Sequence, residues 1–398
     1  MHLVEGCWKT GETQGVHRHK LFYSLNSVDI VLTRHGLSAP APGQGIISLH
    51  ARKGFMTMKV LLNWFATADE TARVMEHLPP HCEVVSPKMP TAPRPGLSRF
   101  TIQHADIEDL CEDVEAIMGW VVESETIRAS RALKILLWMH SGCNDLDLDL
   151  LSARGVHLCN ASGANSIAVA EHAMALMLGL AKRIVQRDKW VKDAHWQPLW
   201  HPDYIATTLA DRTLLVVGLG AIGSAVARRA KAFDMKVLGV RRNPARGCGS
   251  VDRIYGPEEF HAALGEADFV ILALPLTHET ANIMNRQAFD SLKSGARLVN
   301  VARGALIDLK ALYDALEDGR LANFGTDCWW HYQDKEPKYH YPIPEADLVK
   351  FPNVIATAGQ ASSSDGVKER LIDFGIESLA AFVLGKPVPR TVDLDLGY

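Results

Sequence analysis

The stretch LLVVGLGAIGSAVARRAKAF, Leu214–Phe233, decides the fold of this 398-residue chain. Its apolar start predicts a strand, GLGAIG is a GxGxxG turn, and the alanine-rich remainder predicts a helix. In such a unit the first glycine allows a tight turn, the second lets backbone approach a pyrophosphate, and the third lets the helix pack on the strand. We therefore expect a dinucleotide at the helix N-terminus, with a structural glycine turn as the alternative. The residues expected to bind it are Gly218, Gly220, Ala221, Ile222 and Gly223.

Strands and helices alternate on both sides of this stretch. Upstream, the alternation starts with MKVLLNW at Met58 and predicts one parallel sheet. Downstream it predicts another, of about six strands, with helices covering its faces. Apart from the strand in the opening stretch, the downstream strands are expected at 236–240, 269–274, 296–302, 321–329 and 353–358.

The domain boundaries follow from the segments around these sheets. Residues 165–191 form the longest helical stretch, apolar nearly all round until Lys182, and we expect a buried helix there. The final helix, in 374–389, is expected to pack on the first sheet. We therefore expect a substrate domain at 58–163 with 357–398 and a dinucleotide-binding domain at 164–356. Residues 1–57 show no sustained period and are expected to be a poorly ordered extension.

Composition excludes several classes of protein. The net charge is −4, so no basic field favours nucleic acid as a partner. No apolar run reaches the roughly 18–20 residues of a membrane span. Seven cysteines without a CxxC pair predict reduced thiols and a cytoplasmic protein. His17 and His19 alone do not predict a metal site.

The residues after the strand at 236–240 bear on the choice of nucleotide. In an NAD site an acidic residue about 20 residues beyond the glycine turn binds the ribose 2′-hydroxyl. Here the sequence is VLGVRRNPAR, with Arg241 and Arg242 and no carboxylate at that place. Two guanidinium groups suit a 2′-phosphate, because they stay charged and offer paired donors. We expect NADP(H) in preference to NAD(H); the alternative is a solvated basic turn.

Further polar residues follow the later strands. Ligands of open parallel sheets lie outside the carboxyl ends of the strands. Arg303 comes directly after a buried strand, where a guanidinium is costly unless it meets a partner. That partner is expected to be a substrate carboxylate or carbonyl, with a structural ion pair as the alternative. Asp327 is expected to bind the nicotinamide carboxamide. The other expected cofactor contacts at these strand ends are Leu274, Pro275, Thr280, Val301 and Ala302.

Five segments together resemble the D-isomer-specific 2-hydroxyacid dehydrogenase superfamily, which includes glyoxylate/hydroxypyruvate reductases and the phosphite and formate dehydrogenases. They are ANSIAVAEH, VVGLGAIGSAVARRAKAFDMKV, ADFVILALPLTHETANIMN, ARLVNVARGALIDLKALYDALEDGRL and GTDCWWHY. The resemblance implies two Rossmann-like α/β domains with an active-site cleft between them, a homodimer, and a small carboxylate substrate. It implies that Ser141 and Gly142 hold the substrate carboxylate, that Asn165 lies on the substrate side, and that Arg303 orients the substrate.

The sequence departs from that family at two positions. The family's catalytic acid corresponds to Tyr332, and its catalytic histidine to Gly359, beside Gln360. Three interpretations follow. In the first, the chain interconverts 2-oxo and 2-hydroxy acids with Tyr332, His331, His140 or water ordered by Gln360 in place of the lost pair. In the second it oxidises formate, which needs no general base. In the third it is a weakly catalytic cofactor sensor.

Overall fold

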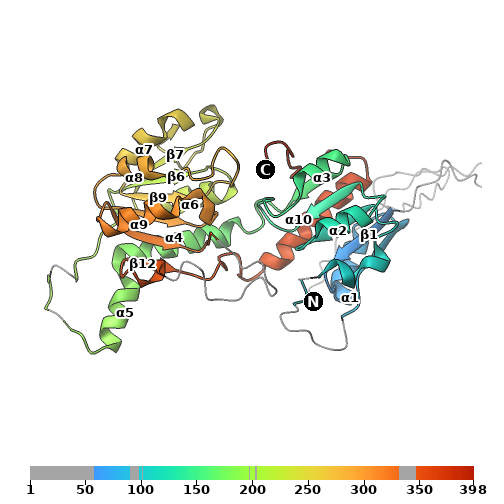
Figure 1. The fold of residues 1–398 in the computed structure, drawn as a ribbon, viewed down its shortest axis with the longest axis horizontal. Coiled ribbons are helices and arrows are strands. Elements are labelled where there is room, and N and C mark those ends of the chain that lie inside the picture. The colour runs from blue at the N-terminus through green and yellow to red at the C-terminus, as the bar shows by residue number, and fades with distance from the viewer. Residues whose placement is uncertain (1–57, 90–97, 101, 197, 202–203, 331–346) are drawn as a thin grey trace, which may run out of the picture. The chain divides into compact units, whose positions relative to one another are not determined.

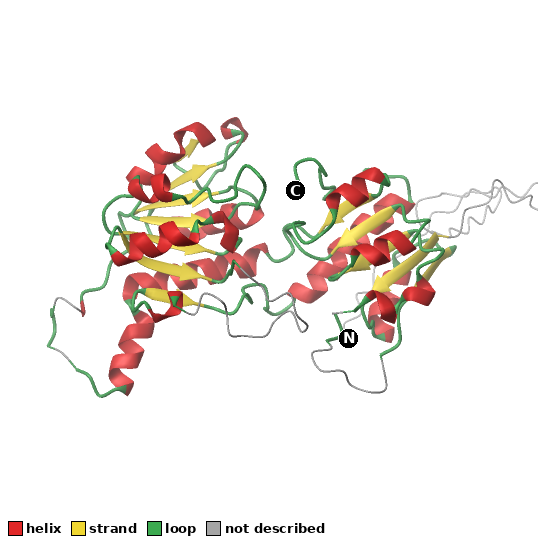
Figure 2. Cartoon of the chain, viewed as in Figure 1, coloured by secondary structure: helices red, strands yellow, loops and turns green. Residues whose placement is uncertain are grey.

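A computed structural model describes residues 58–89, 98–100, 102–196, 198–201, 204–330 and 347–398. These ranges hold two parallel sheets, shown in yellow in Figure 2 with their helices in red. The α/β class and the two Rossmann-like sheets predicted from the sequence are confirmed. The first 57 residues lie outside the described ranges, so the expectation for them stays a prediction.

The first sheet has five strands in the order β2-β1-β3-β4-β5. Its core is continuous with the apolar side of α10, because Ile372, Ile376 and Leu379 are buried among the strand residues. The first helix is capped by Thr67, whose side chain forms a capping box with that of Glu70. The elements are β1 (Met58–Asn63), α1 (Ala68–Glu76), β2 (Cys82–Val85), β3 (Ala116–Gly119), α2 (Ser124–Ala129), β4 (Ile135–Trp138), α3 (Leu148–Ala153), β5 (His157–Asn160) and α10 (Val367–Val383).

The second sheet has seven strands in the order β12-β11-β10-β9-β6-β7-β8 (Figure 1). Residues of α7, α8 and α9 belong to the core cluster on one face, and those of α4 and α6 to the cluster on the other. The elements are α4 (Ser166–Lys182), α5 (Ile184–Lys192), β6 (Thr213–Val217), α6 (Ala221–Lys231), β7 (Lys236–Val240), β8 (Arg253–Tyr255), α7 (Phe260–Glu266), β9 (Phe269–Leu272), α8 (Arg286–Asp290), β10 (Ala296–Asn300), α9 (Leu309–Glu317), β11 (Leu321–Thr326) and β12 (Val354–Ala356).

Two sequence-based expectations need correction. The sheet has seven strands where about six were expected, because β8, a three-residue strand, was not among the predicted ones. The predicted helix 165–191 is two helices, because Arg183 adopts the left-handed conformation at φ 55° and ends α4. In Figure 1, α5 consequently runs in a different direction from α4.

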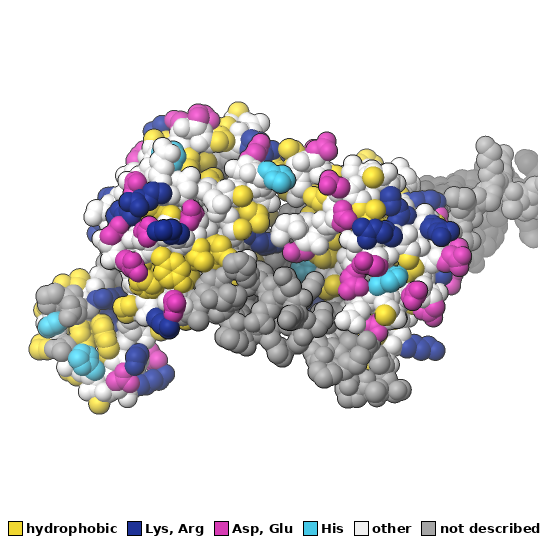
Figure 3. Space-filling view, viewed as in Figure 1, with side chains coloured by type: hydrophobic (Ala, Val, Ile, Leu, Met, Phe, Trp, Pro, Cys, Tyr) yellow, Lys and Arg dark blue, Asp and Glu magenta, His cyan; other side chains and the backbone are white. Residues whose placement is uncertain are grey.

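Charged side chains of both signs lie on the surface (Figure 3). On the face drawn in Figure 3, Lys and Arg side chains are interspersed with Asp and Glu rather than gathered into a basic region. Among the described residues, no helix is long and apolar enough to cross a membrane. The same residues contain no group of three or more His, Cys, Asp or Glu side chains placed to hold a metal ion.

Candidate active site

The glycine turn connects β6 to α6, and its three glycines have different surroundings. Gly218 has φ 95°, and a β-carbon on it would lie 2.5 Å from the carbonyl oxygen of Ala273. A β-carbon on Gly223 would lie 1.8 Å from the carbonyl oxygen of Gly218. Gly220 instead faces open space, with nothing within 4 Å of such a carbon. The first and third glycines close the turn, and the second leaves room for a ligand beside the free N–H groups of α6. This geometry fits a dinucleotide.

The two arginines after β7 make different contacts. Arg241 donates from Nη1 to the carbonyl of Gly247 at 3.2 Å. Arg242 pairs with the carboxylate of Glu279, and both side chains are exposed. Arg241 is partly exposed and Arg242 is exposed. Their pairing with NADP stays a prediction.

Arg303 follows β10, and its guanidinium is oriented by polar atoms that carry no charge. Its Nε donates to Oδ1 of Asn144 at 3.0 Å, and its Nη1 donates to the carbonyl of Ala302 at 2.9 Å. Among the described residues, no carboxylate lies within ion-pair distance of Arg303. Its Nη2 lies 2.4 Å from where a β-carbon on Gly142 would be, so Gly142 lets the guanidinium approach the loop.

The segment after β4 carries the residues expected to hold the substrate. The hydroxyl of Ser141 donates to Oδ1 of Asn165 at 3.0 Å. Asn165 precedes α4 and uses this oxygen rather than capping the helix. Nε2 of His140 lies 2.8 Å from the carbonyl of Trp120, which makes that nitrogen a donor. The structure thus joins Ser141 to Asn165 and brings Gly142 to Arg303.

The carboxylate of Asp327 organises the loop after β12. Its Oδ1 accepts from the backbone N–H groups of Gly359 at 3.0 Å and Gln360 at 3.2 Å, and its Oδ2 accepts from Ala361 at 2.8 Å. The hydroxyl of Thr357 donates to Oδ1 at 2.6 Å. Asp327 is 4% exposed, so these donors replace water around a buried carboxylate. Its expected bond to the nicotinamide stays a prediction; in the structure its first role is to hold this loop.

Gly359 allows that loop to close on Asp327. Its φ is 72°, a conformation that strains any residue with a β-carbon. The position that corresponds to the family's histidine is thus a glycine in the left-handed conformation. Gln360, next to it, is exposed. Tyr332 and His331, the other proposed substitutes for the lost pair, lie outside the described residues.

His172 is a polar residue of this region that the sequence did not reveal. From α4, its Nε2 lies 2.9 Å from the hydroxyl of Thr357 and 3.6 Å from Oδ1 of Asp327. Since Thr357 donates to Asp327, the imidazole donates to Thr357, and the three side chains form a chain of hydrogen bonds. The segment NSIAVAEH contains this histidine, but nothing in its spacing points to an aspartate 155 residues away.

Three buried asparagines at strand ends also escaped the sequence-based prediction. Asn160 ends β5 and donates to the carbonyl of Ser141 at 2.9 Å. Asn300 ends β10, donates to the carbonyl of Arg303 at 2.8 Å, and accepts from the N–H of Ala302 at 3.0 Å. Asn63 ends β1 and donates to the carbonyl of Val121. The available signal was an amide at the end of an apolar strand, where buried polar groups need partners.

The remaining predicted contacts lie at strand ends of the second sheet. Val301 and Ala302 are buried beside Arg303, and Leu274 and Pro275 follow β9. The hydroxyl of Thr280 donates to the carbonyl of Pro275 at 2.7 Å, so it closes its own loop. The structure places these residues at the edge of the sheet that carries the glycine turn.

Two cysteines near Arg303 are excluded as nucleophiles. Burial raises the pKa of the Cys143 thiol to about 11 and that of Cys328 to about 12, although the charge of Arg303 opposes both shifts. A thiol with such a pKa is protonated at neutral pH and unreactive. Neither thiol is therefore expected to supply a nucleophile to this site.

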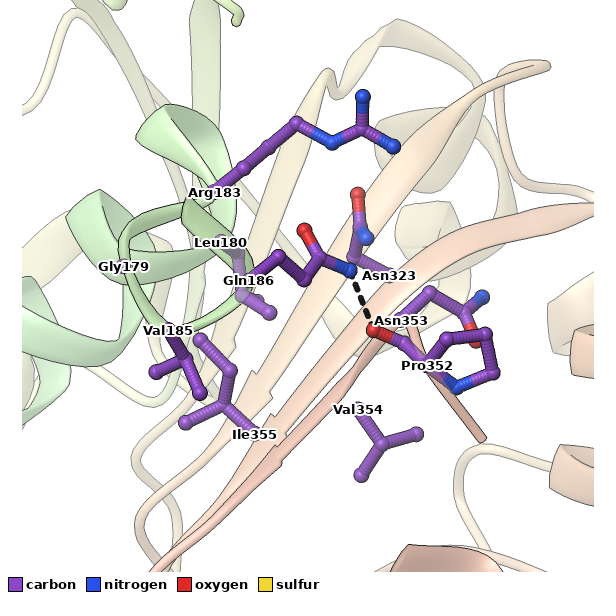
Figure 4. A pocket seen from close by; sticks show the side chains of 10 residues that line it. All are labelled: Gly179, Leu180, Arg183, Val185, Gln186, Asn323, Pro352, Asn353, Val354 and Ile355. Atoms are coloured by element: carbon purple, nitrogen blue, oxygen red, sulfur yellow. Dashed lines mark hydrogen bonds between the residues drawn. The ribbon is translucent and has the colours of Figure 1, made fainter. Parts of the chain in front are cut away.

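A small pocket beside the end of α4 is separate from these residues. Figure 4 shows it between the α4–α5 junction and strands β11 and β12, where the amide of Gln186 donates to the carbonyl of Pro352. None of its lining residues was predicted to bind substrate or cofactor. Its lining residues are Gly179, Leu180, Arg183, Val185, Gln186, Asn323, Pro352, Asn353, Val354 and Ile355.

Comparison with known proteins decides the family. The family described as "D-isomer specific 2-hydroxyacid dehydrogenase, NAD binding domain" matches residues 174–361. A glyoxylate reductase from Korarchaeum cryptofilum is 33% identical over 291 residues, which are 72% of this chain and 84% of that protein. The chain belongs to the D-isomer-specific 2-hydroxyacid dehydrogenases. The resemblance inferred from the five sequence segments is thereby confirmed.

Solved structures of 2-hydroxyacid dehydrogenases and related proteins share the fold. The TT0316 protein from Thermus thermophilus has a TM-score of 0.65 and 30% identity, and the alignment covers 84% of this chain and all of that one (100%). An NADPH-dependent glyoxylate/hydroxypyruvate reductase from Sinorhizobium meliloti, solved with NADP and malonate, has a TM-score of 0.65 and 25% identity over 86% of this chain and 98% of that one. This 2-hydroxyacid dehydrogenase is accordingly a nicotinamide-dependent oxidoreductase of the type that acts on a CH–OH group.

Proposed function

We propose that this 2-hydroxyacid dehydrogenase uses NADP(H) to interconvert a small 2-oxo acid and the corresponding 2-hydroxy acid, at a site whose acid/base group is altered. The single observation that carries the proposal is Arg303. It follows β10 with no carboxylate partner among the described residues, held by Asn144 and by its own chain. An oriented guanidinium of this kind matches a carboxylate or an α-carbonyl oxygen.

Each residue around the proposed substrate has an expected role. The bound nicotinamide would supply or accept the hydride. Arg303 holds the substrate oxygens, and the Ser141–Gly142 segment offers backbone N–H groups to the carboxylate. Asp327 holds the loop that carries Gln360, because three backbone N–H groups of that loop donate to its carboxylate. An amide orients a water molecule but does not remove a proton, so the proton transfer is slower than with an imidazole.

We expect the purified protein to reduce glyoxylate and hydroxypyruvate with NADPH. Because positioned acid–base catalysis contributes about 10²–10⁴-fold, the rate should be lower than that of relatives with the Glu–His pair by up to that factor. The absorbance at 340 nm measures NADPH oxidation with glyoxylate, hydroxypyruvate and longer 2-oxo acids. The same absorbance measures the formation of NADPH from NADP⁺ with formate. Fluorescence titration of NADPH and NADH on the same preparation gives the two dissociation constants.

The alternatives give different results in the same experiment. Formate oxidation without 2-oxo acid reduction contradicts the proposed substrate class. Tight NADPH binding without turnover of any substrate supports the sensor instead. Tighter binding of NADH than of NADPH contradicts the proposed role of Arg241 and Arg242.

We also propose a homodimer, on the basis of exposed apolar side chains in and after α5. Trp196 is 84% exposed and Trp200 is 79% exposed, values that favour a covered surface in the assembled protein.

Light scattering should give about twice the chain mass of 43.8 kDa. Trp200→Asp should shift the protein toward the monomer, whereas Val349→Asp, another exposed apolar position, should not. A monomeric parent protein would refute the proposal. The other exposed apolar residues here are Ile184, Val185, Val191 and Leu199.

A further inference from the structure

The ion pair of Arg242 with Glu279 joins two loops that flank the glycine turn. In the second sheet β6, whose carboxyl end carries that turn, lies between β7 and β9. Arg242 follows β7 by two residues, and Glu279 lies in the loop after β9. The pair therefore connects the loops on either side of the carboxyl end of β6, the region where open α/β sheets bind their nucleotide.

The loop that carries Glu279 is closed by its own hydrogen bonds. The N–H of Thr277 donates to the hydroxyl of Thr280 at 2.8 Å, and that hydroxyl donates to the carbonyl of Pro275 at 2.7 Å. The N–H of Ala281 donates to the carbonyl of Thr277 at 2.9 Å. Glu279 thus extends from an ordered turn toward Arg242.

The carboxylate of Glu279 and a ribose 2′-phosphate require the same donors. Both bind a guanidinium through two oxygens, and both are anionic, so they repel each other at one arginine. Arg241 donates to a carbonyl and Arg242 to a carboxylate, which makes Arg242 the one whose charge is partly neutralised. A cofactor without the 2′-phosphate leaves the Arg242–Glu279 pair intact.

We propose that Glu279 is a specificity-determining residue, which lowers the affinity for NADP(H) relative to NAD(H) by competing with the 2′-phosphate for Arg242. This inference rests on the proposed NADP(H) function. The residues that normally decide between NAD and NADP follow β7. Glu279 lies in another loop, after β9, and limits the preference for NADP(H) from there. The arginine pair and Glu279 together set the ratio of the two dissociation constants.

The test is a set of fluorescence titrations with NADPH and NADH. Glu279→Gln keeps the side-chain shape and removes the charge. We expect NADPH to bind about three- to tenfold more tightly, because an exposed charge pair is worth up to about 1 kcal/mol and the repulsion is lost as well. NADH binding should change by less than about twofold, and the NADPH gain should shrink at high salt. Glu317→Gln, which removes the same charge from the end of α9, is the matched control and should change neither.

Arg242→Gln separates this inference from the function on which it rests. We expect this variant to bind NADPH about tenfold more weakly, and Glu279→Gln to have no further effect in the double variant. Unchanged NADPH binding in Arg242→Gln refutes the role of Arg242 in NADP binding, and the inference with it. Weaker binding in Arg242→Gln, with Glu279→Gln equal to Glu317→Gln, overturns the competition alone. Weaker NADPH binding in Glu279→Gln also overturns it, because Glu279 would then position Arg242.

Discussion

The Arg303→Gln variant should lose about 10²–10³-fold in kcat/KM for glyoxylate reduction, because removing one preorganised charge-stabilising donor from a reaction site costs about this much. Arg303 has no carboxylate partner among the described residues, and the proposed function assigns its charge to the substrate. Arg303→Lys should recover little of the loss, since an ammonium cannot reproduce the paired guanidinium donors.

Cofactor titration distinguishes a substrate role of Arg303 from general damage. The dissociation constant of NADPH for Arg303→Gln should stay within about threefold of the parent value, because the glycine turn and Arg242 are unchanged. Asn144→Ala should raise KM about tenfold with a smaller effect on kcat, since it removes the acceptor at Nε that orients the guanidinium. A threefold or smaller loss in Arg303→Gln would remove the observation on which the proposed function rests.

The Asp327→Asn variant should be the least stable of the single variants considered. The carboxylate is buried and accepts hydrogen bonds from Thr357 and from three successive backbone N–H groups. An amide offers one oxygen and turns two N–H donors toward N–H groups, so at least one buried donor is left unpaired. The expected cost is about 2–4 kcal/mol, which lowers Tm by several degrees.

The control for Asp327 lies in the same loop. Asp365→Asn removes an exposed carboxylate just beyond the residues that Asp327 binds and should change Tm by about 1 °C or less. NADPH titration of both variants tests the further prediction that Asp327 binds the nicotinamide carboxamide. If Asp327→Asn is as stable as Asp365→Asn, the carboxylate does not hold the loop. If it is unstable but binds NADPH normally, its role is confined to the loop.

Local sequence patterns predicted the features whose residues lie close together in the chain. The glycine turn was predictable because its three glycines, the strand before them and the helix after them lie within 20 residues. Arg303 was predictable because a charged residue directly after a buried strand needs a partner. In contrast, the helix breaks at Arg183 because this one residue is left-handed. An arginine within a helical pattern gives no sequence signal for that conformation.

The sequence by itself therefore determined the α/β class, the family, the dinucleotide turn and the arginine at the end of β10. Only the tertiary structure decided which groups meet: Asp327 with backbone 32 to 34 residues away, Arg242 with Glu279 at 37 residues, and Arg303 with Asn144 at 159 residues. The physical reason is that a helix or strand period encodes which face is buried, whereas a hydrogen bond between distant loops depends on which loops the folded chain brings together. The loop that lacks the expected histidine shows this most clearly, because the carboxylate that accepts its backbone N–H groups directly follows the neighbouring strand β11.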